Sequence, residues 1–312
     1  MKKFFRLLFK LTLVLFVLLN IITAFHAYKF THIYERSEVP VKSPGEKTAW
    51  DKTSDILFGA KVAKQQNIVP DSTFETVILK TGGGIQLEAW YIKTKGTAKG
   101  TVVLFHGHVS KKSSVMNEGE GFRQLGYNTL LVDFRAHGNS GGNTCTIGYQ
   151  ESEDVKLAYD YIKAKGEKNI VLWGISMGAA AVSKAISDYG LQPSKAILEM
   201  PFATIRQAAE GRVKMMGLPA QPLSSFVLFW GSVENGFWAF RMKPAEFAKK
   251  ITIPTLLQWG RHDPRVMQEE TDLIYKNLAG KKQLVVYESA AHESLCDKEH
   301  GKWMASVGSF LN

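Results

Sequence analysis

Cysteine is scarce in this chain, since 312 residues include only Cys145 and Cys296. So few cysteines exclude a small scaffold held together by dense disulfides. A chain of this length, with 45% hydrophobic residues, can bury a large core without metals or repeats. Neither cysteine lies near residue 20, which excludes a lipid-modified cysteine behind a leader. We therefore expect one large folded domain with attachments.

Acidic residues are missing from the first ten positions, which contain Lys2, Lys3, Arg6 and Lys10. These four cations account for four units of the net charge of +10 and leave the remainder only mildly basic. The remainder also lacks a Lys/Arg run with interleaved aromatic residues, the pattern of a surface that follows phosphates. A nucleic-acid partner is therefore not expected, and the basic end fits membrane topology better.

Residues 7–25 form an almost continuous apolar run that is nearly long enough to cross a bilayer as a helix. A cleaved signal peptide and an uncleaved signal anchor both fit this run. The small-x-small cleavage pattern is missing, because Phe25 stands two residues before Ala27 and Ile22 stands two before Ala24. This absence favours an anchor.

In the anchor interpretation, residues 1–27 are a transmembrane segment that contacts the membrane through residues 7–25. The basic end then lies in the cytoplasm, and the folded domain lies outside, in the periplasm or the extracellular space.

Residues 28–72 mix charges with prolines and contain one weakly amphipathic stretch, 50–64, which indicates a stalk with a docking helix. The pattern then becomes regular. Residues 74–80 and 85–92 alternate around three glycines at 82–84, which predicts an antiparallel hairpin.

The remainder of the folded domain, 73–312, alternates short apolar runs with helix-length segments. Such runs are typical of parallel strands buried on both faces. The predicted strands are 101–105, 127–132, 169–173, 196–198, 254–259 and 283–287. The predicted helices are 151–165, 177–189, 268–278 and 293–310. This alternation predicts the α/β class, with a mostly parallel central sheet and helices on both faces.

About fifty residues separate two of the predicted strands, and the interval is too long for a bare loop. We expect a helical cap over about 201–250. Six aromatic residues crowd into fifteen positions of it: Phe226, Phe229, Trp230, Phe237, Trp238 and Phe240. They either attach the cap to the body or form an apolar substrate pocket or a membrane-facing lid, and the sequence leaves both readings open.

Gly174-Ile175-Ser176-Met177-Gly178 follows a predicted strand and begins a predicted helix. This strand-turn-helix setting is what a nucleophile elbow requires, and glycines at both ends allow the tight turn. Ser176 is therefore the predicted nucleophile.

A serine hydroxyl needs a base to take its proton and a third group to orient that base. Asp263 directly follows the strand 254–259, and His292 follows the strand 283–287. The order Ser176, Asp263, His292 is the chain order of such a triad.

Acyl transfer also needs donors for the developing oxyanion. The residue after the nucleophile, Met177, can offer its backbone N–H, and His108 can offer a second one because Gly107 lets the chain turn. The side chains of His106 and His108 suggest a metal site, but no carboxylate or cysteine cluster accompanies them. No metal and no cofactor are expected.

These motifs, together with the segment Asp133 to Ser140 and the pattern Gly260-x-x-Asp263-x-x-Val266, resemble the α/β-hydrolase superfamily over roughly residues 72–312. The likeness is greatest to the serine aminopeptidase and monoglyceride-lipase-like group of small esterases. The resemblance implies that the segment from Asp133 is structural. It also makes Glu199 a fallback acid, since some relatives place the acid there.

The expected activity is hydrolysis of carboxylic or acyl esters, small-molecule or lipid-like, through an acyl-enzyme. A peptidase of the same fold and a catalytically idle binding module remain alternatives. An aminopeptidase needs acids to bind a free amine, whereas the cap carries seven Lys/Arg against Glu210, Glu234 and Glu246. A disulfide between Cys145 and Cys296 is permitted if the domain is exported. The sequence indicates neither the preferred chain length nor the oligomeric state.

Overall fold

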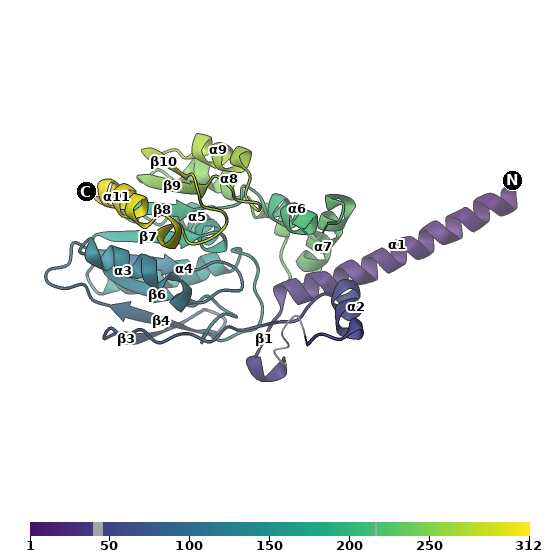
Figure 1. Cartoon of the computed structure of the whole chain (residues 1–312), viewed down its shortest axis with the longest axis horizontal. Coiled ribbons are helices and arrows are strands. Elements are labelled where there is room, and N and C mark those ends of the chain that lie inside the picture. The colour runs from purple at the N-terminus through teal and green to yellow at the C-terminus, as the bar shows by residue number, and fades with distance from the viewer. Residues whose placement is uncertain (40–45, 216) are drawn as a thin grey trace.

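A central β-sheet organises the chain (Figure 1). The computed structural model describes residues 1–39, 46–215 and 217–312. Within these residues the main sheet has eight strands, in the spatial order β10-β9-β8-β7-β5-β6-β4-β3. Their bounds are β3 (Glu75–Lys80), β4 (Gln86–Ile92), β5 (Thr101–Phe105), β6 (Asn128–Val132), β7 (Ile170–Ile175), β8 (Lys195–Glu199), β9 (Thr255–Gly260) and β10 (Lys282–Tyr287).

The strand directions follow the predicted pattern. The hairpin β3–β4 is antiparallel, with Val77 opposite Ala89, and β4 also pairs antiparallel with β6. From β6 to β10 every neighbouring pair is parallel. The central strand β5 is buried along its whole length, as a continuous Val/Leu/Phe run requires when helices cover both faces. The carboxyl ends of the parallel strands therefore meet at one edge of the sheet.

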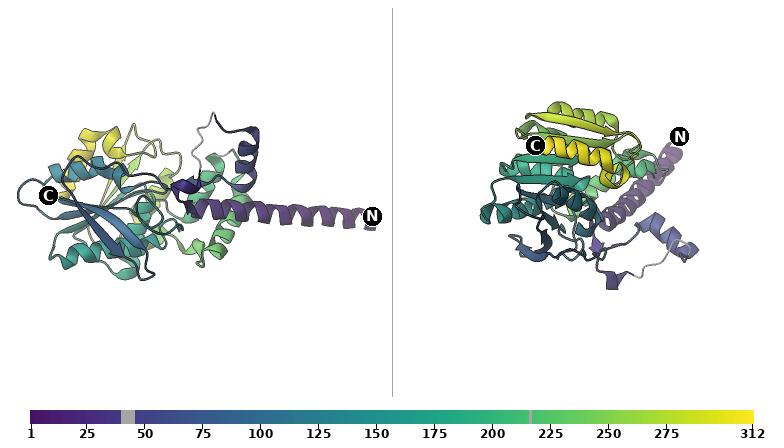
Figure 2. Two further views of the ribbon diagram at one scale, coloured as in Figure 1. Left: turned by 90° about the horizontal axis from the view of Figure 1, so that it is seen from below. Right: turned by 60° about the vertical axis from the view of Figure 1, so that its left-hand side comes forward.

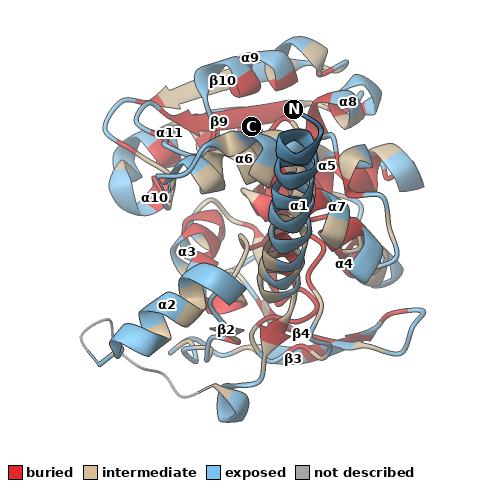
Figure 3. Cartoon of the chain, turned by 90° about the vertical axis from the view of Figure 1, so that its right-hand side faces the viewer, coloured by how far each residue is buried: buried red, intermediate tan, exposed pale blue. Residues whose placement is uncertain are grey.

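Helices cover both faces of this sheet (Figure 3). The helices α3, α10 and α11 lie on one side, and α4, α5 and α8 lie on the other. The predicted helix 293–310 is divided into α10 and α11, and α3 was not predicted. The bounds are α3 (Met116–Gln124), α4 (Glu151–Ala164), α5 (Met177–Tyr189), α8 (Pro244–Phe247), α9 (Gln268–Asn277), α10 (Leu295–Lys298) and α11 (His300–Leu311).

A single long helix, α1 (Lys2–Thr31), projects from the body with the N-terminus at its far end (Figures 1 and 2). It extends the predicted apolar run 7–25 at both ends. Most of its residues before Ala27 are exposed, and the helix is long and apolar enough to cross a membrane. After α1 a short parallel pair forms from β1 (Ile33–Tyr34) and β2 (Val62–Ala63).

The predicted docking helix 50–64 is shorter than expected and docks on α1. The helix α2 (Ala49–Phe58) ends at Gly59, whose φ of +77° favours glycine. Phe58 packs edge-on against Phe25, with ring centroids 5.3 Å apart. The stalk therefore folds back beside the N-terminal helix.

Two cap helices, α6 (Ile205–Met215) and α7 (Ala220–Glu234), lie beside the body-proximal half of α1 (Figure 1). Phe226 packs on Phe16 with centroids 5.9 Å apart, and the indole of Trp230 donates a 3.2 Å hydrogen bond to Asn20. Phe237 packs on Tyr149 of the body. These three cap aromatics thus attach the cap to α1 and the body.

Candidate active site

Ser176 sits on a sharp turn between β7 and α5. Its backbone has φ of +53° and ψ of −114°, which is strained for a residue with a side chain and is the geometry expected of a nucleophile elbow. The two glycines are needed for space. A Cβ on Gly178 would lie 2.2 Å from the carbonyl oxygen of Phe105, and a Cβ on Gly174 would lie 2.5 Å from the carbonyl carbon of Gly178.

The structure brings together the three residues of the predicted triad. The Ser176 Oγ lies 2.9 Å from His292 Nε2, and His292 Nδ1 lies 2.6 Å from Asp263 Oδ2. The other carboxylate oxygen of Asp263 accepts hydrogen bonds from the backbone N–H groups of Arg265 and Val266, at 2.7 and 3.0 Å. The buried Asp263 carboxylate is therefore held on one side while its second oxygen faces the imidazole.

The loops that carry Asp263 and His292 are joined to each other. The backbone N–H of His262 donates to the carbonyl of Ala290 at 3.0 Å. Gly260 permits this approach, because a Cβ there would lie 2.5 Å from the carbonyl oxygen of Ala291. The acid and the base therefore keep a fixed separation.

A cavity of about 760 Å³ opens above Ser176. The residues chosen as oxyanion donors, His108 and Met177, both line it. Met177 begins α5, and the first N–H groups of a helix have no intrahelical acceptor. A Cβ on Gly107 would lie 3.7 Å from the Ser176 Cβ, so the loop before His108 touches the nucleophile.

The side chains of His106 and His108, which suggested a metal site, contact protein groups instead. His106 Nε2 accepts a hydrogen bond from the backbone N–H of Phe134, and the ring of His108 lies against Phe30. Burial and the neighbouring His137 hold the pKa of both imidazoles well below the usual value, so both are neutral. Among the residues with described positions, no group of three His, Cys, Asp or Glu could hold a metal ion.

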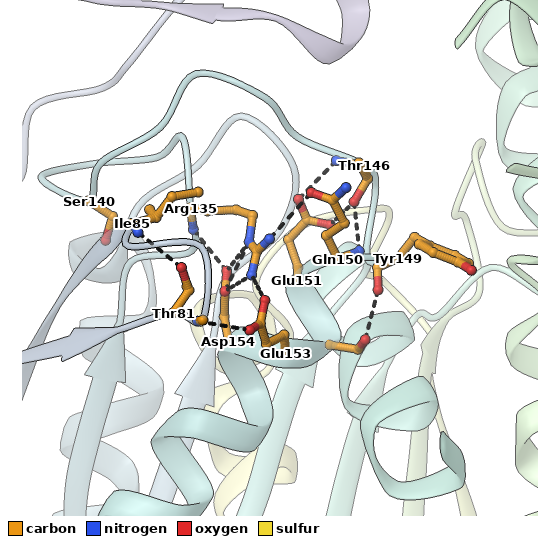
Figure 4. Close-up of polar contacts among 12 residues, drawn as sticks. Thr81, Ile85, Arg135, Ser140, Thr146, Tyr149, Gln150, Glu151, Glu153 and Asp154 are labelled. Carbon is orange, nitrogen blue, oxygen red and sulfur yellow. Dashed lines mark hydrogen bonds and ion pairs between the residues drawn. The ribbon is translucent and has the colours of Figure 1, made fainter. Parts of the chain in front are cut away.

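The segment that begins at Asp133 supports the loops beside the site. Its Asp133 accepts hydrogen bonds from the backbone N–H and the ammonium of Lys112, both at 2.6 Å. The Arg135 guanidinium contacts the Asp154 carboxylate at 2.6 Å and Glu153 at 2.7 Å (Figure 4). The Asp133 contacts join the loop after β6 to the segment before α3, and the Arg135 contacts join it to the start of α4.

Glu199, the fallback acid, is bonded elsewhere. Its Oε1 accepts hydrogen bonds from the indoles of Trp173 and Trp303, at 2.9 and 2.7 Å. Burial raises the pKa of this carboxyl to about 8. The geometry therefore favours Asp263 as the partner of His292 and gives Glu199 a place in the core.

The disulfide between Cys145 and Cys296 is absent, so that hypothesis is wrong for this structure: both cysteines are buried free thiols. Cys145 points at the thioether of Met177, with the two sulfurs 3.5 Å apart, whereas Cys296 lies 3.5 Å from His300 Nδ1. Each thiol is therefore packed into its own surroundings rather than against the other.

Many lining residues of the cavity were not predicted from the sequence, and Phe30, Arg212 and Arg265 are among them. Phe30 comes from the end of α1, Arg212 from the cap helix α6, and Arg265 from the loop that holds Asp263. The excess of Lys and Arg over Glu in the cap could have indicated a basic residue such as Arg212 at the cavity. None of the six cap aromatics lines this cavity, which argues against the alternative that they form its apolar substrate pocket.

Comparison with known proteins finds hydrolases among the similar proteins. The model of the S33 serine aminopeptidase family matches residues 96–235. A carboxylesterase of Bacillus subtilis is 24% identical, covering 67% of this chain and 91% of its own. The uncharacterized protein YqkD of the same organism is 25% identical, covering 75% and 78%.

A solved esterase structure from Pyrococcus furiosus superposes with a TM-score of 0.66 and 26% identity, over 80% of this chain and 96% of its own. The shared sheet and the family match agree. The chain therefore has the α/β-hydrolase fold and is similar to the S33 serine aminopeptidase family and to small esterases.

Proposed function

We propose that this protein is a serine esterase that hydrolyses carboxylic or acyl esters at the surface of a membrane. One observation carries the proposal: Ser176, His292 and Asp263 form a continuous hydrogen-bonded chain, and Ser176 and His292 line an open cavity. A hydroxyl, an imidazole and a buried carboxylate in this order can activate an oxygen nucleophile.

The reaction has two steps. The Ser176 oxygen attacks the ester carbonyl while His292 Nε2 takes the hydroxyl proton, and Asp263 stabilises the resulting imidazolium. The N–H groups of His108 and Met177 bind the oxyanion until the alcohol leaves with the proton from His292. Water, activated by His292, then attacks the acyl-enzyme, releases the acid and restores Ser176.

The helix α1 serves as a retained membrane anchor in this proposal. Its contacts with the cap support retention, because removal of α1 would uncover Phe226 and Trp230, which pack on it. The four basic residues among the first ten support an orientation with the N-terminus in the cytoplasm and the hydrolase domain outside.

The cap is then a membrane-facing lid. Its helix α7 runs beside α1 from Phe16 to Thr31, alongside the outer part of the span. Phe229 and Val233 of α7 are exposed and would face lipid. Phe30, which lines the cavity, lies five residues beyond Phe25, or about 7.5 Å along the helix axis. That height matches lipid headgroups, so a lipid-like ester can reach Ser176 from the bilayer.

The alternatives fit less well. An aminopeptidase would need acids to bind the substrate amine, whereas Arg212 and Arg265 face the cavity. An idle binding module has no use for the strained backbone at Ser176 or for a Ser-His-Asp chain.

The test is labelling of membranes that contain the full-length protein with a fluorophosphonate probe, beside the variants Ser176→Ala and Ser183→Ala. Ser183 is a matched control, because its hydroxyl lies in α5 and donates to the carbonyl of Ala179. The expected result is labelling of the wild type and of Ser183→Ala, with none for Ser176→Ala and a band of full-length size. A folded wild type without labelling would favour the idle module.

A further inference from the structure

Two arginines line the same catalytic cavity and lie close to each other. Arg212 lies on α6 and Arg265 on the loop after β9, and both line the cavity. The backbones approach closely, since a Cβ on Gly211 would lie 3.2 Å from the carbonyl oxygen of Arg265. Burial and the charge of Arg265 lower the pKa of Arg212. Two like charges are thus brought together at the site.

Neither guanidinium has a carboxylate partner in the described part of the chain. The ion pairs there involve other arginines, such as Arg135 and Arg261, and the guanidinium of Arg212 instead stacks on the ring of Phe30, 4.6 Å from its centroid. Two adjacent cations without an acid repel each other, and a bound anion would relieve that repulsion.

A third polar group at the same wall also lacks a partner. The Nε2 atom of His108 is buried, and no residue with a described position bonds to it. The ring is neutral, and a neutral imidazole nitrogen can pair with a substrate hydroxyl. The ring of Phe30 contacts both the His108 ring, at 4.7 Å, and the Arg212 guanidinium, at 4.6 Å, and Arg265 lines the same cavity.

The acids of the cavity are engaged elsewhere. Glu118 accepts a hydrogen bond from Ser294, and burial raises its pKa to about 7. Glu293 accepts from the backbone N–H of Ala291 and lies 3.8 Å from Lys298. Neither carboxylate is paired with the two arginines.

We infer that Arg212 and Arg265 form an anion-binding subsite, which selects ester substrates that carry a phosphate or carboxylate close to the scissile bond. The guanidinium fork matches both groups geometrically, and a substrate hydroxyl beside the anion would reach His108 Nε2. This inference deepens the proposed function and rests on it for the position of the scissile ester.

Substrate preference tests the subsite in the full-length protein in neutral detergent. Three decanoyl esters are compared by kcat/KM: decanoylglycerol, which is neutral, decanoylglycerol phosphate and decanoyl lactate. The expected wild-type preference is at least about 10-fold for one or both anionic esters. Which anionic ester is preferred identifies phosphate or carboxylate. The acetyl ester of glycerol phosphate shows whether a water-soluble anion is also accepted.

The variants Arg212→Gln and Arg265→Gln should each lower the anionic-to-neutral ratio by about 10-fold, and the double variant by about 100-fold. The ratio cancels any general loss of active protein. Lys214→Gln is the control, because Lys214 lies on the same helix, carries the same charge and does not line the cavity. It should leave the ratio unchanged. An equal ratio in wild type and double variant would overturn the subsite.

Binding separates this inference from the proposed function. With Ser176→Ala, calorimetry with decyl phosphate and decanoate should show a Kd that rises by about 100-fold when both arginines become Gln. Unchanged binding of both ligands would reject the subsite, even if esters are hydrolysed. Conversely, arginine-dependent binding in a protein that no fluorophosphonate labels would keep the subsite and reject the esterase.

Discussion

The ring of Phe30 lies 4.7 Å from the ring of His108, so the last turn of the N-terminal helix contacts the loop that is proposed to bind the oxyanion. The same phenylalanine supports the guanidinium of Arg212. The helix that resembles a simple tether is therefore part of the wall of the candidate active site.

Phe30→Ala should lower the thermal midpoint by about 4 °C, because the lost ring contacts are worth about 2 kcal/mol for a partly buried phenylalanine. The measurement is a thermal unfolding scan of the full-length protein in neutral detergent. Phe229→Ala is the matched control, since Phe229 is exposed on α7 and should shift the midpoint by less than about 1 °C in detergent. Equal shifts for the two variants would contradict the packing described for Phe30.

Asp263→Asn should reduce kcat by about 10⁴-fold with little change in fold, because an amide cannot hold and charge-balance the His292 imidazolium. Glu199→Gln should change kcat by less than about 10-fold, since Glu199 contacts two indoles and not the histidine. Steady-state hydrolysis of one neutral ester measures both. The opposite ranking would make Glu199 the acid of the triad.

Stability should fall as pH rises from about 4.5 towards 8, in part because of Glu199. Its pKa in the folded protein is raised to about 8 by burial, whereas an unfolded glutamate titrates near its ordinary value. In that window the folded state binds more protons than the unfolded state. The contribution of Glu199 to the free energy of unfolding is therefore complete below the pKa of the unfolded glutamate. It is lost as the pH rises through the pKa of Glu199 in the folded protein.

Thermal midpoints of the wild type and of Glu199→Gln across this pH range isolate the effect. The fall with pH should be shallower in the variant, because glutamine cannot ionise in the core. Curves of identical slope would show that Glu199 titrates normally in the folded protein.

Gly178→Ala should destabilise the protein by about 3 kcal/mol and abolish fluorophosphonate labelling, because the new methyl would overlap the Phe105 carbonyl. Gly301→Ala serves as the control. Gly301 lies in α11, has no heavy atom within 4 Å of its ideal Cβ and should gain up to about 1 kcal/mol from alanine. Chemical denaturation measures both changes. Wild-type stability of Gly178→Ala would refute the close approach of α5 to β5.

The sheet and the three residues of the Ser-His-Asp chain could be predicted because each depends on a local pattern. An apolar run predicts a strand whose carboxyl end lies at one edge of the sheet. Ser176 and Asp263 follow the buried strands β7 and β9, and His292 follows the edge strand β10, which is only partly buried. The helix α3 escaped prediction because Gly119 and Gly121 lower its propensity.

The structure explains one of these glycines: a Cβ on Gly121 would lie 2.6 Å from the ring of Trp303, which is distant in sequence. The role of Phe30 could not be predicted for the same reason: it depends on the packing of α1 against α7, and no local sequence pattern indicates that packing. Whether Cys145 and Cys296 meet also depends on tertiary packing.

The contact between α1 and the cap bears on whether the folded domain could stay active after cleavage from the N-terminal helix. A protease that cut after Thr31 would release a shed ectodomain without Phe30 and without the helix on which Phe226 and Trp230 pack. Such a fragment would lack one wall of the catalytic cavity and would expose an apolar surface on the cap, which favours aggregation. If the proposed esterase is anchored through α1, its activity would therefore depend on the intact anchor, and release of the domain from the membrane would end that activity.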